Sequence, residues 1–177
     1  MPWSLDYQPP KEPILLDKIF LASGKALYLA SAFEEKCKFI LRIVNIVQHH
    51  ESTGDTSATA ALAKALKDKM LGPTIKELSS ITEFRETDLA KLERGKDARN
   101  YIAHESTQLG PLSSASAKSI NAKLAQLRTE LDALSAADNL VSTWLYEIGE
   151  KEPAPLGIQT AYPAWVCKWV FEGRHDT

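Results

Sequence analysis

The stretch INAKLAQLRTELDAL, residues 120–134, decides the fold class of this chain of 177 residues. Its apolar positions are spaced alternately by four and three residues, which places them on one face of an α-helix. They are Ile120, Leu124, Leu127, Leu131 and Leu134, and the stripe resumes at Val141, Leu145 and Ile148. The pattern predicts a helix from Ser113 or Ser114 to about residue 149. At about 1.5 Å per residue this rod is roughly 45 Å long, enough to span a bundle and reach a neighbour.

Further helical patterns lie upstream of this stretch. A stripe of apolar residues predicts a helix or helix pair over 14–49, either continuous or interrupted near Ser23-Gly24. Its members are Phe33, Cys37, Ile40, Leu41, Val44 and Val47. Helices are also expected over 58–70, where Gly72-Pro73 stops the chain, over 74–81, and over 83–106, where Gly95 marks a kink or break. No stretch has the pattern of a β-sheet.

The two ends of the chain differ from the middle. Residues 1–13 contain four prolines, which predict an extended arm. Pro153 and Pro155 break the long helix, and the aromatic-rich tail over 153–177 is either a short helix after Pro163 or a packed extended segment. We therefore predict an all-α helical bundle of four or five main helices, forming one domain over 1–177.

Composition limits the classes of function. The chain is 44% hydrophobic and 25% charged, as in ordinary globular proteins, and its net charge of −2 gives no general basic field. Nucleic-acid binding must therefore rest on a local patch. The start of the chain lacks a secretory signal pattern and no apolar run approaches about 20 residues, so we expect a cytoplasmic protein that does not enter membranes. Two distant cysteines without CxxC spacing are expected to stay reduced.

The segment DARNYIAHE, residues 97–105, carries the most chemistry. On a helix, one arc about 140° wide holds Arg99, Ala103, Asn100 and His104 in that order. The opposite side holds Ala98, Tyr101 and Ile102. One face can therefore dock on a core while the other presents a cation, an amide and an imidazole. Such a face suits a phosphodiester.

Each of the three polar residues has a chemical role in cleaving RNA. His104 titrates near neutral pH, so it can take the proton of a ribose 2′-hydroxyl or give one to the leaving 5′ oxygen. Arg99 offers a planar cationic fork that clamps two phosphoryl oxygens, and Asn100 can orient His104 or bond the phosphate. Attack by the 2′-hydroxyl predicts a 2′,3′-cyclic phosphate and a 5′-hydroxyl, with no metal or other cofactor.

The pattern Arg-Asn-x-x-x-His on a helix of a small all-helical chain resembles the HEPN superfamily, whose signature is arginine, four to six residues, then histidine. The match covers Arg99 to His104. The resemblance implies a helical bundle and, as in many members, a metal-independent endoribonuclease of a toxin–antitoxin or anti-phage system. It also implies a homodimer in which two motifs face each other, with RNA as substrate and a cognate antitoxin or regulatory protein as a further partner. Some members continue with a modifiable tyrosine, where this chain has Ser106.

Other interpretations stay open. Arg99 can pair with a neighbouring carboxylate while His104 caps the helix C-terminus, where the dipole favours a cation. Upstream, Lys96 and Arg94 either extend the positive strip toward RNA or belong to a solvated face shared with nearby acidic residues. The chain is then a non-catalytic HEPN-like module that binds a nucleotide or a partner protein, or a purely structural dimerisation bundle. No metal site is predicted, because His49-His50 are adjacent and diverge on a helix.

Overall fold

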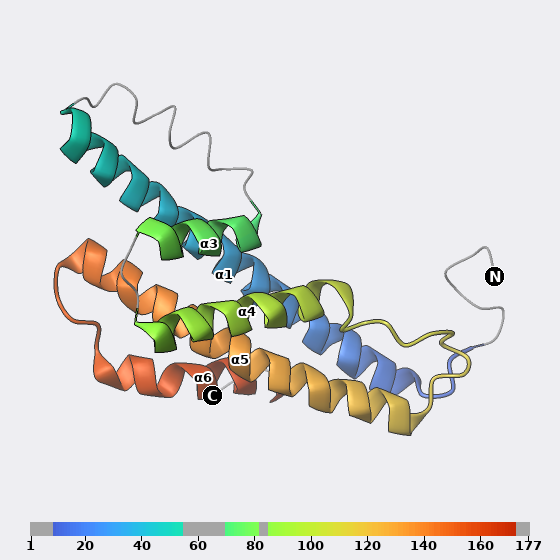
Figure 1. Ribbon diagram of the computed structural model, residues 1–177. Helices are drawn as coiled ribbons and strands as arrows, with labels where there is room; N and C mark the ends of the chain where they lie inside the picture. The colour runs from blue at the N-terminus through green and yellow to red at the C-terminus, as the bar shows by residue number, and fades with distance from the viewer. Residues whose placement is uncertain (1–8, 55–69, 82–84, 173–177) are drawn as a thin grey trace.

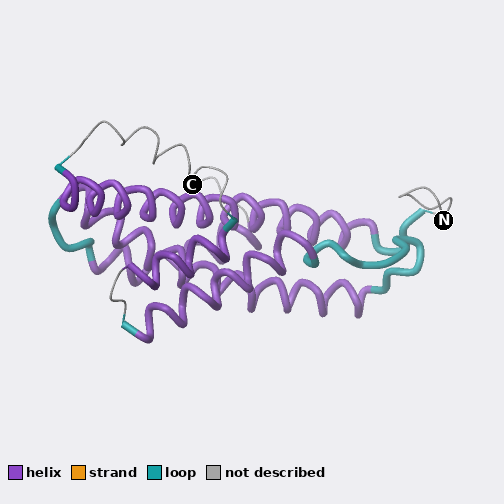
Figure 2. The backbone as a smooth tube through the Cα atoms, turned by 45° about the horizontal axis from the view of Figure 1, so that its top comes forward, coloured by secondary structure: helices purple, strands orange, loops and turns teal. Residues whose placement is uncertain are grey.

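The computed structural model describes residues 9–54, 70–81 and 85–172. This part of the chain is an all-α bundle of five helices without a strand, which confirms the predicted fold class (Figures 1 and 2). The helices are α1 (Pro13–Thr53), α3 (Leu71–Ile81), α4 (Glu86–His104), α5 (Ala117–Glu150) and α6 (Leu156–Glu172). None of them has a stretch that is both long and apolar enough to cross a membrane.

The long helix α5 lies at the centre and packs against α1, α4 and α6. Its stripe residues Leu127, Leu131 and Leu134 are buried, as the spacing predicts, and share one core with Phe33 of α1 and Leu92 of α4. Helix α1 runs parallel to α5, whereas α4 and α6 run antiparallel to it (Figure 1). The C-terminal end of α4 therefore lies toward the N-terminal half of α1.

Two helix starts differ from the sequence prediction. Helix α5 begins at Ala117 because Ser116 caps it, and Ser119 returns the hydrogen bond in a reciprocal capping box. The helix expected over 74–81 begins three residues earlier, at Leu71, so Gly72 and Pro73 lie in its first turn. A proline there is compatible with a helix because its missing N–H has no intrahelical partner at that position. The helix expected over 58–70 falls almost wholly outside the described residues.

Helix α1 is continuous, so the alternative of an interruption near Ser23-Gly24 is wrong. It begins at Pro13 and ends at Thr53. The next residue, Gly54, caps it with a left-handed φ of 66°, and its N–H donates to the His50 carbonyl at 2.8 Å. Of the predicted extended arm over 1–13, residues 9–13 are described; residues 9–12 are not helical, whereas Pro13 is the first residue of α1.

Within the predicted tail, residues 156–172 form one helix, α6, which starts at Leu156 and passes through Pro163, so both alternatives for this segment are wrong. Proline lacks the N–H that would bond the carbonyl four residues earlier, which here belongs to Gln159. The side-chain amide of Asn139 on α5 donates to that carbonyl at 2.7 Å. A neighbouring helix therefore satisfies the group that proline leaves unbonded.

A buried polar cluster joins α1, α5 and α6. Asp138 is 2% exposed, both of its carboxylate oxygens lie 2.9 Å from the Lys36 ammonium, and it accepts a hydrogen bond from the Tyr162 hydroxyl. Burial, followed by the Asp138 charge, raises the pKa of Tyr162. Both cysteines are free thiols, and burial raises the pKa of Cys37.

Gly95 does not kink α4, contrary to the prediction, because the helix runs through it. The reason for glycine is the close approach of α5: a Cβ at this position would overlap the Ala137 Cβ and stand 3.2 Å from Phe33. We expect Gly95→Ala to lower the free energy of unfolding by about 2 kcal/mol despite alanine's better helix propensity, since overpacking forces the helices apart.

Urea denaturation of both proteins measures this change. Gly149→Ala on α5 is the matched control, because a Cβ there meets nothing within 4 Å, and it is expected to be neutral or slightly stabilising. An equal or higher stability of Gly95→Ala would show that the two helices do not need glycine to pack.

Candidate phosphodiester site

The motif helix has the two faces that its sequence predicts. Ala98, Tyr101 and Ile102 are buried against the bundle. On the other side Asn100 and His104 are exposed, and the side chain of Arg99 is 26% exposed. Arg99 and His104 are separated by five residues, about 7.5 Å along the helix axis. The core thus holds one side of α4 and leaves the polar arc at the surface.

Arg99 is anchored by a carboxylate of α1. Its Nη2 lies 2.5 Å from Glu34 Oε2, and the Glu34 side chain is only 14% exposed. Glu34 also pairs with Lys38 at 3.0 Å, so two cations share this one carboxylate. Lys38 also pairs with Glu35 at 3.1 Å, so two carboxylates of α1 balance Arg99 and Lys38 on this flank of the motif. The ion pair between Arg99 and Glu34 is also the contact that the structural interpretation of Arg99 predicts.

Asn100 bonds Arg99 and not His104. Its Oδ1 accepts a hydrogen bond from Arg99 Nη1 at 3.2 Å, so the amide helps to fix the guanidinium. A guanidinium carries five N–H donors, and the contacts with Glu34 and Asn100 use two of them. The arrangement orients the fork of Arg99 while keeping donors for a phosphate.

His104 is the last residue of α4, and its imidazole makes no hydrogen bond within the described part of the chain. A cation lies at the same helix end, because Lys123 of α5 donates to the Glu105 carbonyl at 3.2 Å and stands 5.2 Å from the centre of the Tyr101 ring. The C-terminal end of α4 thus carries a free imidazole and a neighbouring ammonium group.

The two upstream cations are held in ion pairs. Arg94 lies 2.6 Å from Glu130 of α5, and this hydrogen bond raises the pKa of the guanidinium. Lys96 pairs with Glu93 and, at 3.8 Å, with Asp97. Arg94 points to α5 whereas Arg99 points to α1, so these arginines lie on opposite flanks of α4. Only Lys96 is on the side of the polar arc.

Two residues near the motif were missed by reasoning from the sequence. Glu34 follows Phe33 directly at the edge of the buried stripe of α1, and this position next to a core residue was the available signal. Lys123 lies in the α5 pattern among other surface residues, and no signal distinguished it. Both contacts depend on how the helices pack, which the local pattern does not contain.

Ser106 is 2% exposed and its hydroxyl donates to the Ile102 carbonyl at 2.7 Å. The position at which some HEPN members carry a modifiable tyrosine is therefore inaccessible here. Among the described residues, no group of three or more histidine, cysteine or acidic side chains is placed to hold a metal ion.

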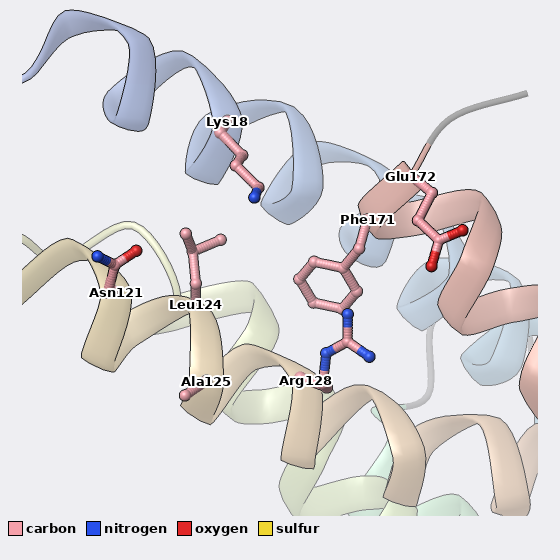
Figure 3. Close-up of a pocket in the computed structure, with 7 residues that line it drawn as sticks. All are labelled: Lys18, Asn121, Leu124, Ala125, Arg128, Phe171 and Glu172. Atoms are coloured by element: carbon pink, nitrogen blue, oxygen red, sulfur yellow. The ribbon is translucent and has the colours of Figure 1, made fainter. Parts of the chain in front are cut away.

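A separate hollow of about 350 Å³ lies between α1, α5 and α6 (Figure 3). Figure 3 shows the Lys18 ammonium and the Arg128 guanidinium near the Phe171 ring, and Leu124 and Glu172 also line the hollow. The guanidinium is 4.6 Å from the centre of that ring and donates to Cys167 Sγ at 3.3 Å. Neither cation forms an ion pair with a described residue.

Comparison with protein-family models, with curated proteins and with solved structures finds no match to this chain. The case for a function therefore rests on the motif and on the geometry of these side chains.

Proposed function

We propose that this protein is a metal-independent endoribonuclease of HEPN type, acting as a toxin or anti-phage component under a cognate antitoxin or regulator. The observation that carries the proposal is the pairing of an exposed His104 with an Arg99 that Glu34 and Asn100 hold in place on the same face of α4. A fixed cation beside a titratable imidazole is the equipment that acid–base cleavage of a phosphodiester needs.

In the proposed reaction, the ribose 2′-oxygen attacks phosphorus and the bond from phosphorus to the 5′ oxygen breaks. One imidazole takes the 2′ proton and a second group gives a proton to the leaving 5′ oxygen, so the proton count balances. Arg99 binds the non-bridging oxygens, whose charge grows in the transition state. The products are a 2′,3′-cyclic phosphate and a 5′-hydroxyl.

One copy of α4 supplies a single histidine, which is too little for both proton transfers. We therefore include a homodimer in the proposal, with RNA bound by the motifs of both copies. Lys96 and Lys123 lie on or beside this surface and are placed to contact the RNA backbone, whereas Arg94, paired with Glu130 on the far flank, contributes less.

The experiment is an RNA cleavage assay with the purified protein in excess EDTA, in which the product ends are identified. We expect cleavage to persist in EDTA and to leave cyclic phosphate and 5′-hydroxyl ends. Activity that requires a divalent metal, or that leaves 5′-phosphate ends, would contradict the proposed chemistry.

A second candidate function is the binding of a small anion that carries a flat aromatic base, such as a nucleoside monophosphate, in the hollow of Figure 3. Lys18 and Arg128 face that space as cations without a carboxylate partner in the described part, and Phe171 offers an aromatic surface on which a base can stack. Its volume of about 350 Å³ is within the usual range of small-molecule sites.

Calorimetric titration of the full chain with AMP and with adenosine tests this candidate. We expect AMP to bind more tightly than adenosine, and Lys18→Gln or Arg128→Gln to weaken AMP binding at least about fivefold, since each removes a charge-assisted contact. Lys168→Gln, an exposed change on α6, is the control. Equal binding of adenosine, or no loss in either variant, would reject this site, and retained binding in His104→Ala would separate it from the motif.

A further inference from the structure

The outer face of α1 exposes a cluster of large apolar side chains. Phe20 is 40% exposed, Leu21 62%, Leu27 44% and Tyr28 69%, and all four surround Gly24. We call these five residues the α1 apolar face. Its edge toward α6 is an open groove of about 420 Å³, and there the Tyr28 and Trp169 rings meet edge to face at 6.2 Å. A face this apolar is costly to leave in water.

Gly24 has no role within the single chain. A Cβ at this position would meet nothing within 4 Å, and α1 passes through it as a regular helix. Glycine in a helix interior costs about 1 kcal/mol relative to alanine. A glycine in the middle of an exposed apolar face does have one use, because it allows a second helix to approach closely.

The arrangement around Gly24 is symmetric along the helix. Phe20 and Leu21 precede it by four and three residues, and Leu27 and Tyr28 follow it by three and four. When two such helices cross antiparallel at Gly24, Phe20 meets the partner's Tyr28 and Leu21 meets the partner's Leu27. A surface that is complementary to its own reversed copy is what an isologous two-fold contact requires.

We infer that the α1 apolar face is the homodimer interface and that a second copy of this chain covers it, with the two-fold axis crossing α1 at Gly24. At roughly 150–250 Å² per aromatic residue, and less for leucine, the exposed fractions correspond to several hundred Å² of apolar surface. A standard stable interface buries about 800 Å² per partner. The α1 apolar face therefore supplies the apolar centre of an interface of this size, and polar residues around it supply the rim.

This interface rests on the proposed function, because it specifies the dimer in which two motifs share one composite site. Helix α4 runs antiparallel to α1, so His104 lies beyond Arg99 in the direction of the apolar face. The two-fold axis at Gly24 is perpendicular to both α1 helices and lies in the plane where they touch. Rotation about this axis leaves both copies of α4 on the same side of the α1 contact. The two motifs then border one continuous surface.

The first test is the molar mass in solution, measured by light scattering and by sedimentation. We expect twice 19.6 kDa for the unmodified protein and 19.6 kDa for Leu21→Lys and for Leu27→Glu, each with dimerisation weakened at least about 100-fold, because each buries an unpaired charge. Mixing the two variants should restore a dimer, because Lys at 21 then meets Glu at 27 of the partner. A monomeric unmodified protein, or dimers that neither variant weakens, would overturn the inference.

The second test is a cysteine cross-link that reports the axis directly. In a Cys167→Ser background, Gly24→Cys is expected to form a disulfide between copies under mild oxidation, because a residue on a two-fold axis meets its own counterpart. Val47→Cys, which is 47% exposed on the same helix, is the control and should not cross-link. The reverse result would place the interface elsewhere. Neither test reads RNA cleavage, so an inactive dimer and an active monomer are distinguishable outcomes.

Discussion

Replacing His104 with alanine is expected to lower the rate of RNA cleavage at least about 100-fold, since general acid–base catalysis contributes roughly 10²–10⁴ in rate. Arg99→Ala is expected to cause a loss of about the same size, because it removes the cation that stabilises charge on the phosphoryl oxygens. Single-turnover cleavage of a labelled RNA, with the protein in excess, measures both effects.

The matched control for this experiment is His50→Ala, which removes an exposed histidine at the other end of α1. Its rate should equal that of the unmodified protein. Asn100→Ala is informative as a positioning variant: because Asn100 touches Arg99, we expect the rate to fall about tenfold while the shape of the pH–rate profile stays the same. Undiminished cleavage in both His104→Ala and Arg99→Ala would place the activity in another site or another protein.

Replacing Asp138 with alanine is expected to reduce the free energy of unfolding by about 2–3 kcal/mol, because the Tyr162 hydroxyl loses its acceptor, whereas the Lys36 side chain is 31% exposed and stays partly hydrated. The variant leaves Lys36 without its carboxylate and Tyr162 without its acceptor at the junction of three helices. Urea denaturation measures the loss. Asp132→Ala, an exposed change on the same helix, is the control and should remain within about 0.5 kcal/mol of the unmodified protein.

The same cluster predicts how stability depends on pH in the alkaline range. The pKa of Tyr162 is raised above its ordinary value of 10.0 in the folded protein, so above pH 10 the unfolded chain loses this proton before the folded chain does. The folded state then binds more protons than the unfolded state, and stability falls as pH rises. Tyr162→Phe should remove this part of the alkaline decline, and an unchanged pH profile would contradict the assignment.

The helices could be predicted from the sequence because their apolar stripes are long and regular, as along α5. Where the helices start, and whether a proline or glycine interrupts them, could not be predicted in every case, because contacts from other helices decide these features. Pro163 is accommodated because Asn139 bonds the Gln159 carbonyl, and Gly95 serves helix packing and not bending. A local pattern shows a proline or a glycine but not the partner that makes it acceptable.

The candidate site was likewise predictable only in part. The polar arc of α4 could be predicted, because helix periodicity alone places Arg99, Asn100 and His104 on one side. The partners of that arc could not, because Glu34 reaches Arg99 from about 65 residues earlier in the chain and Lys123 arrives from the following helix. Contacts between residues this far apart in the sequence depend on how the helices pack, and they decide the charge balance of the surface.

Contacts on both flanks of α4 would limit how the proposed RNA substrate binds. Ion pairs attach this helix to α1 and to α5, and the overlap that Gly95 avoids leaves no room for it to slide. A rigid platform has little reorganisation energy to supply on binding, so the nucleic acid must deform to fit it. If the proposed function holds, we expect the protein to prefer flexible, unpaired RNA segments, which can splay a phosphate outward, over regular duplexes.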